Sequence, residues 1–309
     1  MRIIFAGTPE TALPSLRALV EQGHEIVAVL TRPDAPAGRG KKLTASPVAS
    51  LADQLGLPVL KPSKADDELV AQVRGLDADV AAVVAFGMLL PQALLDAVPG
   101  GWINLHFSLL PRWRGAAPVQ RAIWAGDAVS GVTAFRITKP LDAGPVYRTL
   151  EVPVEPGESS GALLARLAEL GAPVLAGAIA DAGAGIQPVP QPTSGITTAA
   201  KIRPADAQID WTRPAAEIDR LVRAVSPDPG AWTLLHGERF KVFTATPAQR
   251  AEPRLAPGEL AADRRHLWVG TGDGDMQLIQ VAAAGRKPMA GADWARGQHD
   301  GVSGVRFDG

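Results

Sequence analysis

The sequence predicts an α/β fold built on a parallel sheet, followed by a small all-β domain. The sheet is predicted by the opening of the chain, where strand-forming residues 2–6 and 25–30 flank a helical pattern at 10–20. A strand, a helix and a second strand in this order produce parallel neighbours with a right-handed crossover. The all-β domain is predicted by residues 231–282, where short strand patterns alternate with turns.

The remaining elements of the first domain continue the alternation of strands and helices. Ser46 and Pro47 have the character of an N-cap and a first helical residue, so a helix is expected from there to Leu55. Further strands are expected at 57–60, 79–85, 131–137 and 146–154, together with one that begins at Trp102. Further helices are expected at 66–74, 91–97, 117–125 and 158–182. We therefore expect a Rossmann-like domain.

A change of composition marks the end of this domain. Residues 187–203 contain three prolines with Ser, Thr and few large apolar residues, which is typical of a linker. We therefore expect a first domain at 1–186, a linker at 187–205 and a second domain at 206–309. The strand patterns of the second domain favour a small β-barrel of the oligonucleotide-binding (OB-like) type. The glycines at 270, 272 and 274 are interpreted as a hairpin turn rather than a nucleotide loop.

Composition excludes several classes of site. The 309 residues include no cysteine, which excludes disulfides, thiolate nucleophiles and Cys-ligated metal. The five histidines show no ligand spacing, so no metal is expected. A net charge of −1 favours neither presence nor absence of nucleic acid. The first strand turns into a loop too soon for a signal peptide, and the apolar run at 81–90 is too short to span a membrane. We expect a cytoplasmic protein without membrane contact.

The candidate site lies at the end of the strand that begins at Trp102. Asn104 and His106 are two residues apart, so their side chains share one face of a strand. Ser108 to Pro111 cannot continue the strand, which places the pair at its carboxyl end, where open α/β sheets bind ligands. An Asn amide beside an imidazole suits acyl transfer, because both stabilise a developing oxyanion. A hydrogen-bonded structural pair is the alternative.

The imidazole needs a partner that fixes its tautomer. Asp142 is the best candidate, since Pro140, Gly144 and Pro145 predict a short loop around it. We expect Asn104, His106 and Asp142 to form one site, in which Asp142 orients His106 and assists proton transfer.

Two loops are expected beside this site. The loop at 31–43 carries Arg39, Lys41 and Lys42, which suit phosphate contacts; a solvated loop without function is the alternative. Residues 86–90 follow an apolar strand and end at the same edge of the sheet. They line a flat-ring pocket in one interpretation and fill the core in the other.

These motifs together resemble a known enzyme family. The string Asn104-x-His106-x-Ser108-Leu109-Leu110-Pro111, followed some thirty residues later by Leu141-Asp142-x-Gly144, resembles the signature of formyltransferases that use 10-formyltetrahydrofolate as formyl donor and an amine as acceptor. The similarity extends to residues 5–10, 32–43 and 112–118, and to Lys201-Ile202 before Ile209-Asp210-Trp211. It therefore covers both expected domains.

The resemblance implies roles for particular residues. Asn104, His106 and Asp142 would be catalytic. The folate would be contacted by Ser108, Leu109, Leu110 and Pro111, with Phe86, Gly87, Met88 and Leu90 around its ring. The implied acceptor is the methionine of initiator methionyl-tRNA, with translation initiation as the process served. Arg39, Lys41, Lys42 and Lys201 would contact that RNA, the second domain would support it, and the enzyme would be a monomer without metal.

This chain departs from the family pattern around Asp142. Pro140, Ala143 and Pro145 stand where Gly, Thr and Asp are common. Asp142 itself is kept, so the resemblance leaves the hydrogen bonds of its loop open.

Other functions share part of this pattern. A formyltransferase acting on an amino-sugar nucleotide or on glycinamide ribotide would share Asn104, His106 and Asp142, but would not require the basic loop and the second domain. A formyl-folate hydrolase is a further alternative. A non-catalytic RNA-binding module is disfavoured by the three polar residues gathered at one sheet edge.

Overall fold

The computed structural model describes residues 1–37, 42–250, 253–299 and 301–308. The chain forms two compact units. The first comprises Met1–Pro118, Val129–Pro153 and Leu164–Ala199, and the second comprises Val119–Ala128, Val154–Leu163 and Ala200–Gly309.

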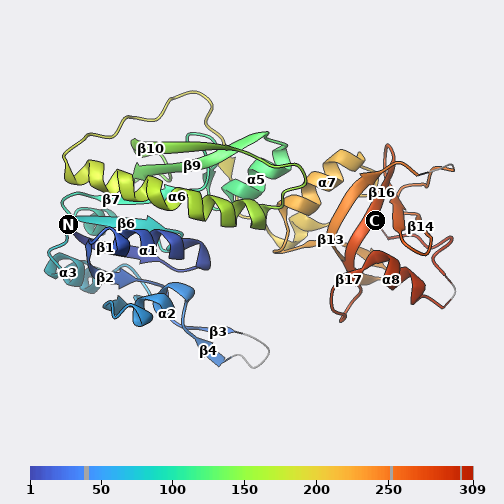
Figure 1. The fold of residues 1–309 in the computed structure, drawn as a ribbon, viewed down its shortest axis with the longest axis horizontal. Coiled ribbons are helices and arrows are strands. Elements are labelled where there is room, and N and C mark those ends of the chain that lie inside the picture. Colours follow the sequence, from blue (N-terminus) through green and yellow to red (C-terminus); the bar gives the residue numbers. More distant parts are fainter. Residues whose placement is uncertain (38–41, 251–252, 300, 309) are drawn as a thin grey trace. The chain divides into compact units, whose positions relative to one another are not determined.

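A seven-stranded sheet with the order β10-β9-β7-β6-β1-β2-β5 forms the centre of the first unit (Figure 1). Its strands are β1 Arg2–Gly7, β2 Glu25–Leu30, β5 Val59–Leu60, β6 Val80–Val84, β7 Trp102–His106, β9 Val129–Arg136 and β10 Val146–Pro153. The five neighbouring strands β7, β6, β1, β2 and β5 are parallel, which confirms the Rossmann-like prediction. However, β9 runs antiparallel to both β7 and β10, so the sheet is mixed. Residues 137–145 between β9 and β10 are fewer than the roughly dozen residues that a parallel crossover needs.

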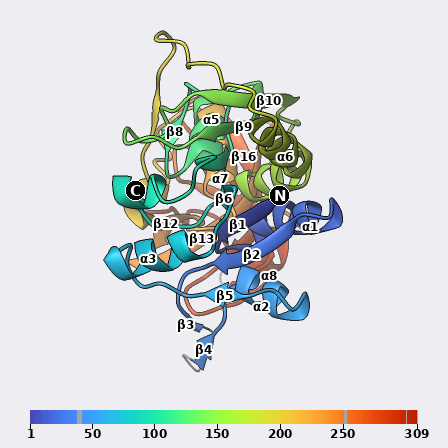
Figure 2. The ribbon, with the colours of Figure 1, turned by 90° about the vertical axis from the view of Figure 1, so that its left-hand side faces the viewer.

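Helices cover both faces of this sheet. They are α1 Leu13–Glu21, which follows the short helix η1 Glu10–Ala12, then α2 Pro47–Gln54, α3 Asp67–Gly75, α4 Gln92–Leu95 and, from Leu164 onward, α6 Ser160–Gly183. Helix α5 Pro118–Ala125 belongs, apart from Pro118, to the second unit. On one face, residues of α3 and α4 form a core with Trp102 and neighbouring strand residues. Figure 2 shows α3 on this side of the sheet and α1 and α6 on the other. Gly171 of α6 comes so close to Leu105 that a Cβ atom there would lie 2.8 Å from its side chain.

The predicted start of α2 is confirmed. The Ser46 hydroxyl accepts a hydrogen bond from the Ala49 N–H, and Pro47 is the first helical residue. The same hydroxyl lies 2.6 Å from the Thr31 hydroxyl. This cap therefore also ties the helix to the end of β2.

Helix α6 is long and apolar enough to cross a membrane by length and composition alone. Half of its most apolar window is buried inside the protein, including the fully buried Leu167 and Leu175. The helix also carries Arg166 and Glu169. These features describe an amphipathic helix of a packed core.

The expected basic loop contains a short hairpin. Strands β3 (Ala35–Ala37) and β4 (Lys42–Thr44) pair antiparallel, with Ala35 opposite Thr44 and Ala37 opposite Lys42. The expectation of a loop throughout residues 31–43 is thus wrong for Ala35–Ala37 and for Lys42 and Leu43, which are in strands. Pro36 is compatible with a strand that has a single partner, because its missing N–H can face solvent. Residues 38–41 lie outside the described part of the chain.

The second unit contains an antiparallel sheet with the order β12-β13-β16-β15-β14, and β17 also pairs with β16. Its strands are β12 Ala231–Leu235, β13 Glu238–Ala248, β14 Leu260–Ala262, β15 Leu267–Gly270, β16 Asp275–Ala282 and β17 Met289–Ala290. Its helices are η2 Pro204–Ala207, α7 Ala215–Ala224 and α8 Gly291–Arg296. The core includes an aromatic cluster of Phe240, Trp294, Phe307 and Trp211. The prediction of a separate antiparallel β domain is confirmed.

The end of the chain connects the two edges of this sheet. The Asp308 N–H donates to the Leu234 carbonyl of β12, and the Leu260 N–H of β14 donates to the Val305 carbonyl, both at 2.9 Å. The glycine repeat forms a turn, in which the Thr271 N–H donates to the Gly274 carbonyl at 2.8 Å. The C-terminal segment therefore leaves neither edge fully open.

Candidate active site

The three polar residues expected at the sheet edge lie in one cavity. Asn104 and His106 come from β7, and Asp142 comes from the connection between β9 and β10. All three line a cavity of about 500 Å³ whose lining residues belong entirely to the first unit. Strand β7 pairs parallel with β6, so residues that follow β6 reach the same edge. The spacing of Asn104 and His106 therefore predicted the meeting point of these groups.

The imidazole of His106 is oriented by a backbone carbonyl. Its Nε2 lies 2.8 Å from the Trp113 carbonyl oxygen. A carbonyl can only accept a hydrogen bond, so Nε2 carries the proton, and the neutral ring presents Nδ1 as an acceptor. Trp113 has a φ of 62°, a left-handed conformation that aims its carbonyl at the ring. No sequence signal marks this contact, because a backbone atom of a non-glycine residue makes it.

Asp142 lies beside the second ring nitrogen. Its Oδ2 is 3.8 Å from His106 Nδ1, which is an ion-pair distance rather than a hydrogen bond. The same oxygen accepts a 2.8 Å hydrogen bond from the Gly115 N–H. Both side chains are largely buried, with 7% and 13% of their surfaces exposed. The carboxylate can therefore attract a proton on Nδ1 with little screening by water.

Backbone contacts shape the loop that holds Asp142. The Ala143 N–H donates to the Pro140 carbonyl at 3.3 Å, and the Arg136 N–H of β9 donates to the Pro145 carbonyl at 2.9 Å. A Cβ atom at Gly144 would lie 1.8 Å from the Arg136 carbonyl oxygen, so only glycine fits there. Pro140, Ala143 and Pro145, the departures from the family pattern, are thus accommodated in a hydrogen-bonded loop.

The Asn104 side chain supplies a free amide. It is partly buried in the cavity wall. In the part of the chain that the structure describes, no hydrogen-bond partner is found for its Nδ2 or Oδ1. A partly buried donor without a protein partner is available to a ligand.

The loop after β6 forms the apolar wall of the cavity. Phe86, Gly87, Met88 and Leu90 all line it, as expected. Phe86 is 2% exposed and belongs to the core under α3 and α4, against which Met88 and Leu90 also pack. The residues that line the cavity therefore also complete the core.

The turn Ser108–Pro111, the expected folate contact, follows β7 directly. Thr133 of β9 donates to the Ser108 carbonyl at 2.7 Å and accepts from the Leu110 N–H at 3.1 Å. The Ser108 hydroxyl donates to the Arg112 carbonyl at 2.7 Å. Leu109 packs over Gly131. Ser108, Leu109, Leu110 and Pro111 therefore support the segment that carries the Trp113 carbonyl.

The segment after α6 also contributes to the site. Its strand β11 (Thr198–Ala199) pairs with β8 (Arg114–Gly115), and the Trp113 N–H donates to the Thr197 hydroxyl at 2.8 Å. The expected linker thus packs against the residues that surround His106. Its Pro- and Ser-rich composition did not indicate this role.

The expected RNA-binding cations occupy different parts of the chain. Lys42 is exposed on β4, and Lys201 is exposed in the second unit. Arg39 and Lys41 lie outside the described residues.

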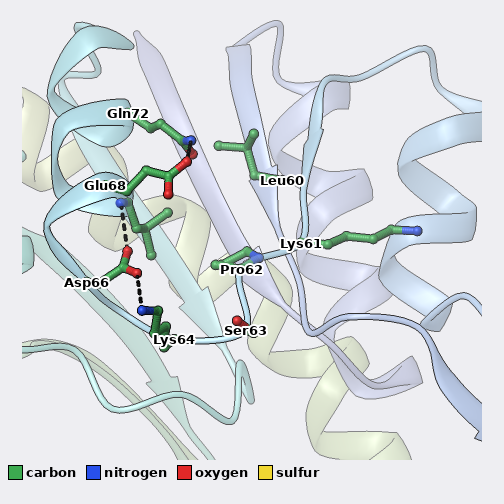
Figure 3. A pocket seen from close by; sticks show the side chains of 9 residues that line it. Leu60, Lys61, Pro62, Ser63, Lys64, Asp66, Glu68 and Gln72 are labelled. Carbon is green, nitrogen blue, oxygen red and sulfur yellow. Dashed lines mark hydrogen bonds and ion pairs between the residues drawn. The ribbon is translucent and has the colours of Figure 1, made fainter.

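A second cavity, of about 320 Å³, lies after β5 and contains no comparable chemistry (Figure 3). Lys64 pairs with Asp66 at 3.0 Å, and this ammonium lowers the pKa of Asp66. Asp66 also caps α3 through the Leu69 N–H, and Gln72 donates to Glu68. Lys61 pairs with Asp34 outside the cavity at 2.7 Å, so each charged group of the lining has a partner. Across residues 1–37, 42–250, 253–299 and 301–308, no group of three or more His, Asp or Glu side chains could hold a metal ion.

A parallel-dominated sheet with Asn, His and Asp at its carboxyl edge suits the chemistry of acyl transfer, and comparison with known proteins identifies the family. Residues 1–179 match the formyl transferase family, and residues 201–299 match the formyl transferase C-terminal domain. The chain belongs to the formyl transferase family.

Its relatives at about 50% identity are methionyl-tRNA formyltransferases. The Streptomyces griseus enzyme is 52% identical over 96% of both chains. The enzyme of Acidothermus cellulolyticus is 50% identical over the full length of both.

Solved structures share the fold at low sequence identity. HypX from Aquifex aeolicus, solved in complex with tetrahydrofolic acid, matches the whole chain with a TM-score of 0.69 and 20% identity. The chain spans about half the length of HypX, with 48% covered. An N-formyltransferase from Helicobacter canadensis matches 89% of this chain and 98% of its own, with a TM-score of 0.67 and 15% identity.

Proposed function

We propose that this protein transfers the formyl group of 10-formyltetrahydrofolate to the α-amine of methionine on initiator methionyl-tRNA, the reaction that prepares this tRNA for translation initiation. The observation that carries the proposal is the full-length likeness to methionyl-tRNA formyltransferases at about 50% identity. The cavity with Asn104, His106 and Asp142 supplies chemistry that suits this reaction.

Asn104 stabilises the transition state in this proposal. The formyl carbonyl oxygen gains negative charge when the amine attacks, and the unpaired Asn104 amide is available to donate to it. A donor that is already held in a cavity wall needs little reorganisation during the reaction.

His106 and Asp142 manage the proton. The attacking amine must lose a proton, and the Nδ1 of neutral His106 is the acceptor that the Trp113 carbonyl leaves available. The imidazolium then faces the Asp142 carboxylate at 3.8 Å, which stabilises its charge. The bond from the formyl carbon to folate N10 breaks, the imidazolium returns the proton to N10, and tetrahydrofolate leaves. The amine of an ester-linked methionine is only weakly basic, so a strong base is not required.

The cavity suits the formyl donor. Its volume of about 500 Å³ falls within the usual size for small-molecule sites. Phe86, Met88 and Leu90 offer an apolar wall for the flat ring, and the polar trio lies at the same cavity. In this proposal Ser108 to Pro111 contact the folate, and their hydrogen bonds to Thr133 hold that turn in place.

The acceptor RNA is bound outside this cavity. Lys42 is exposed on the β3–β4 hairpin, and its ammonium group suits a phosphate contact that does not use the catalytic groups. In this proposal the other contacts come from Arg39, Lys41, Lys201 and residues 206–309. The Lys42→Ala variant should raise the KM for methionyl-tRNA several-fold and leave the KM for folate unchanged. A folate defect in that variant would contradict the assignment of the hairpin.

The decisive experiment compares acceptors. The full chain is incubated with 10-formyltetrahydrofolate and methionine charged on initiator or elongator tRNA, and N-formylmethionine is measured. Formylation of the initiator form, with little of the elongator form, is the expected result. If an amino-sugar nucleotide or glycinamide ribotide is formylated instead, the proposed acceptor is wrong while the catalytic site stands. The proposal also includes a monomer that acts in the cytoplasm, and size-exclusion chromatography with light scattering tests the monomer.

A further inference from the structure

Gln191 lies in the expected linker and contacts the Asp142 loop. Its Nε2 donates to the Asp142 carbonyl at 2.9 Å and to the Gly144 carbonyl at 2.8 Å. One amide group therefore spans the loop on both sides of Ala143. All of these residues belong to the first unit.

The orientation of the Gln191 amide is determined by Arg114. Its Oε1 accepts from Arg114 Nη2 at 2.6 Å and from Nε at 3.2 Å. A guanidinium only donates, so the oxygen must face Arg114 and the NH₂ group must face the loop. Both donors and the acceptor of the amide are thus used.

The loop needs support of this kind. Asp142 has a φ of 48°, a left-handed conformation that is unfavourable for a non-glycine residue and persists only when its surroundings hold it. Two hydrogen bonds from one side chain hold the carbonyls at and just after this residue. The Asp142 carboxylate is thereby kept near His106 Nδ1 and the Gly115 N–H.

We infer that Gln191 is a positioning residue of the formyl-transfer reaction, acting through Asp142, and that Arg114 orients it. This inference rests on the proposed role of Asp142. Gln191 adds to the site a part of the chain that lies beyond α6. It makes the geometry of the acid–base pair depend on that segment, without contact between Gln191 and the reacting atoms.

Two substitutions distinguish the hydrogen bonds that the Gln191 NH₂ group donates from those that its oxygen accepts. Gln191→Leu removes every hydrogen bond at similar size. Gln191→Glu keeps an acceptor for Arg114 but places a carboxylate oxygen against the two loop carbonyls. Gln187→Leu is the matched control, because Gln187 is exposed in the same segment and, among the described residues, its side chain donates only to the Gly185 carbonyl.

The test is steady-state formylation of initiator methionyl-tRNA by the full chain. Both Gln191 variants should lower kcat about ten- to a hundredfold, as expected for a misplaced catalytic group, while both KM values stay within about twofold. Their pH–rate profiles should match that of Asp142→Asn rather than that of the unaltered protein. Gln191→Leu combined with Asp142→Asn should be no slower than Asp142→Asn alone, and Gln187→Leu should be unchanged.

Three outcomes distinguish the possibilities. Full kcat in Gln191→Glu would overturn the inference, and so would losses that multiply in the double variant. If Gln191→Leu does not fold, Gln191→Glu and its double variant with Asp142→Asn decide the question. Full activity of Asp142→Asn would instead remove Asp142 from the mechanism, and the role of Gln191 with it.

Discussion

Replacing Thr133 by Val removes one hydroxyl from the support of the active site. Thr133 is fully buried in β9, and its hydroxyl bridges the Ser108 carbonyl and the Leu110 N–H. Valine has nearly the same shape and is equally suited to a strand. The substitution therefore leaves the packing in place and removes only the two hydrogen bonds.

The cost follows from the two backbone groups left behind. Each buried group without a partner costs about 1–3 kcal/mol, and both Ser108 and Leu110 are buried, at 1% and 8% exposure. The more favourable burial of a methyl group offsets part of this. We expect the free energy of unfolding of the first unit to fall by about 2–4 kcal/mol. We also expect kcat to fall, because this turn leads to the Trp113 carbonyl that orients His106.

Equilibrium urea unfolding of the full chain measures the change, and hydrogen exchange locates it. Thr149→Val is the matched control, since Thr149 is the exposed cross-strand partner of Thr133 on β10. The control should stay within about 0.5 kcal/mol of the unaltered protein. The Leu110 amide should exchange faster in Thr133→Val. A Thr133→Val protein as stable as the control, with unchanged exchange at Leu110, would show that these two hydrogen bonds do not stabilise the first unit.

Three further predictions concern separate parts of the first unit. Asn104→Ala should lower kcat by about a hundredfold or more without loss of stability, because its amide stabilises only the transition state; a near-normal rate of formyl transfer would remove it from the mechanism. Ser46→Ala should destabilise the protein by about 1–2 kcal/mol in urea unfolding, since Ser46 caps α2 and also contacts a buried hydroxyl; an unchanged midpoint would contradict this. The Arg148 guanidinium lowers the pKa of Asp181 through a bidentate pair, so its stabilisation is present above the ordinary carboxyl pKa and is lost as the pH falls through the lowered value. Arg148→Met should therefore cost less than about 1 kcal/mol at pH 7 and nothing in strong acid, and a loss of equal size at both pH values would contradict the sign.

Local signals predicted much of the fold. Ser46-Pro47 marked the start of a helix because an N-cap satisfies backbone N–H groups within three residues. Asn104 and His106 were expected on one face of β7 because side chains alternate between the two faces of a β-strand, and this alternation is a local property of the strand. The direction of β9 depends on how the chain turns after β7, which local signals do not show. The sheet was therefore expected to be parallel throughout, whereas β9 is antiparallel to both of its neighbours.

Contacts between distant segments could not be predicted. Asp142 was expected beside His106 only because Pro140, Gly144 and Pro145 predict a short loop around it and because the family signature contains this aspartate. The Trp113 carbonyl and the Thr197 hydroxyl act through backbone conformation and a pairing across 84 residues. The composition of residues 187–203 does not distinguish a segment that packs against the first unit from a solvent-exposed linker.

The pairing of β8 with β11 has a consequence for how this chain can be divided or recombined. A division at residue 186, where composition changes, would cut away Gln191, Thr197 and β11 from residues that they contact around the site. A hybrid of two related enzymes joined at 186 would combine one parent's Asp142 loop with another parent's support for it. The first unit extends to Ala199, so an exchange point after Ala199 would keep these contacts within one parent. In this protein the boundary of the catalytic machinery lies further along the chain than the change of composition suggests.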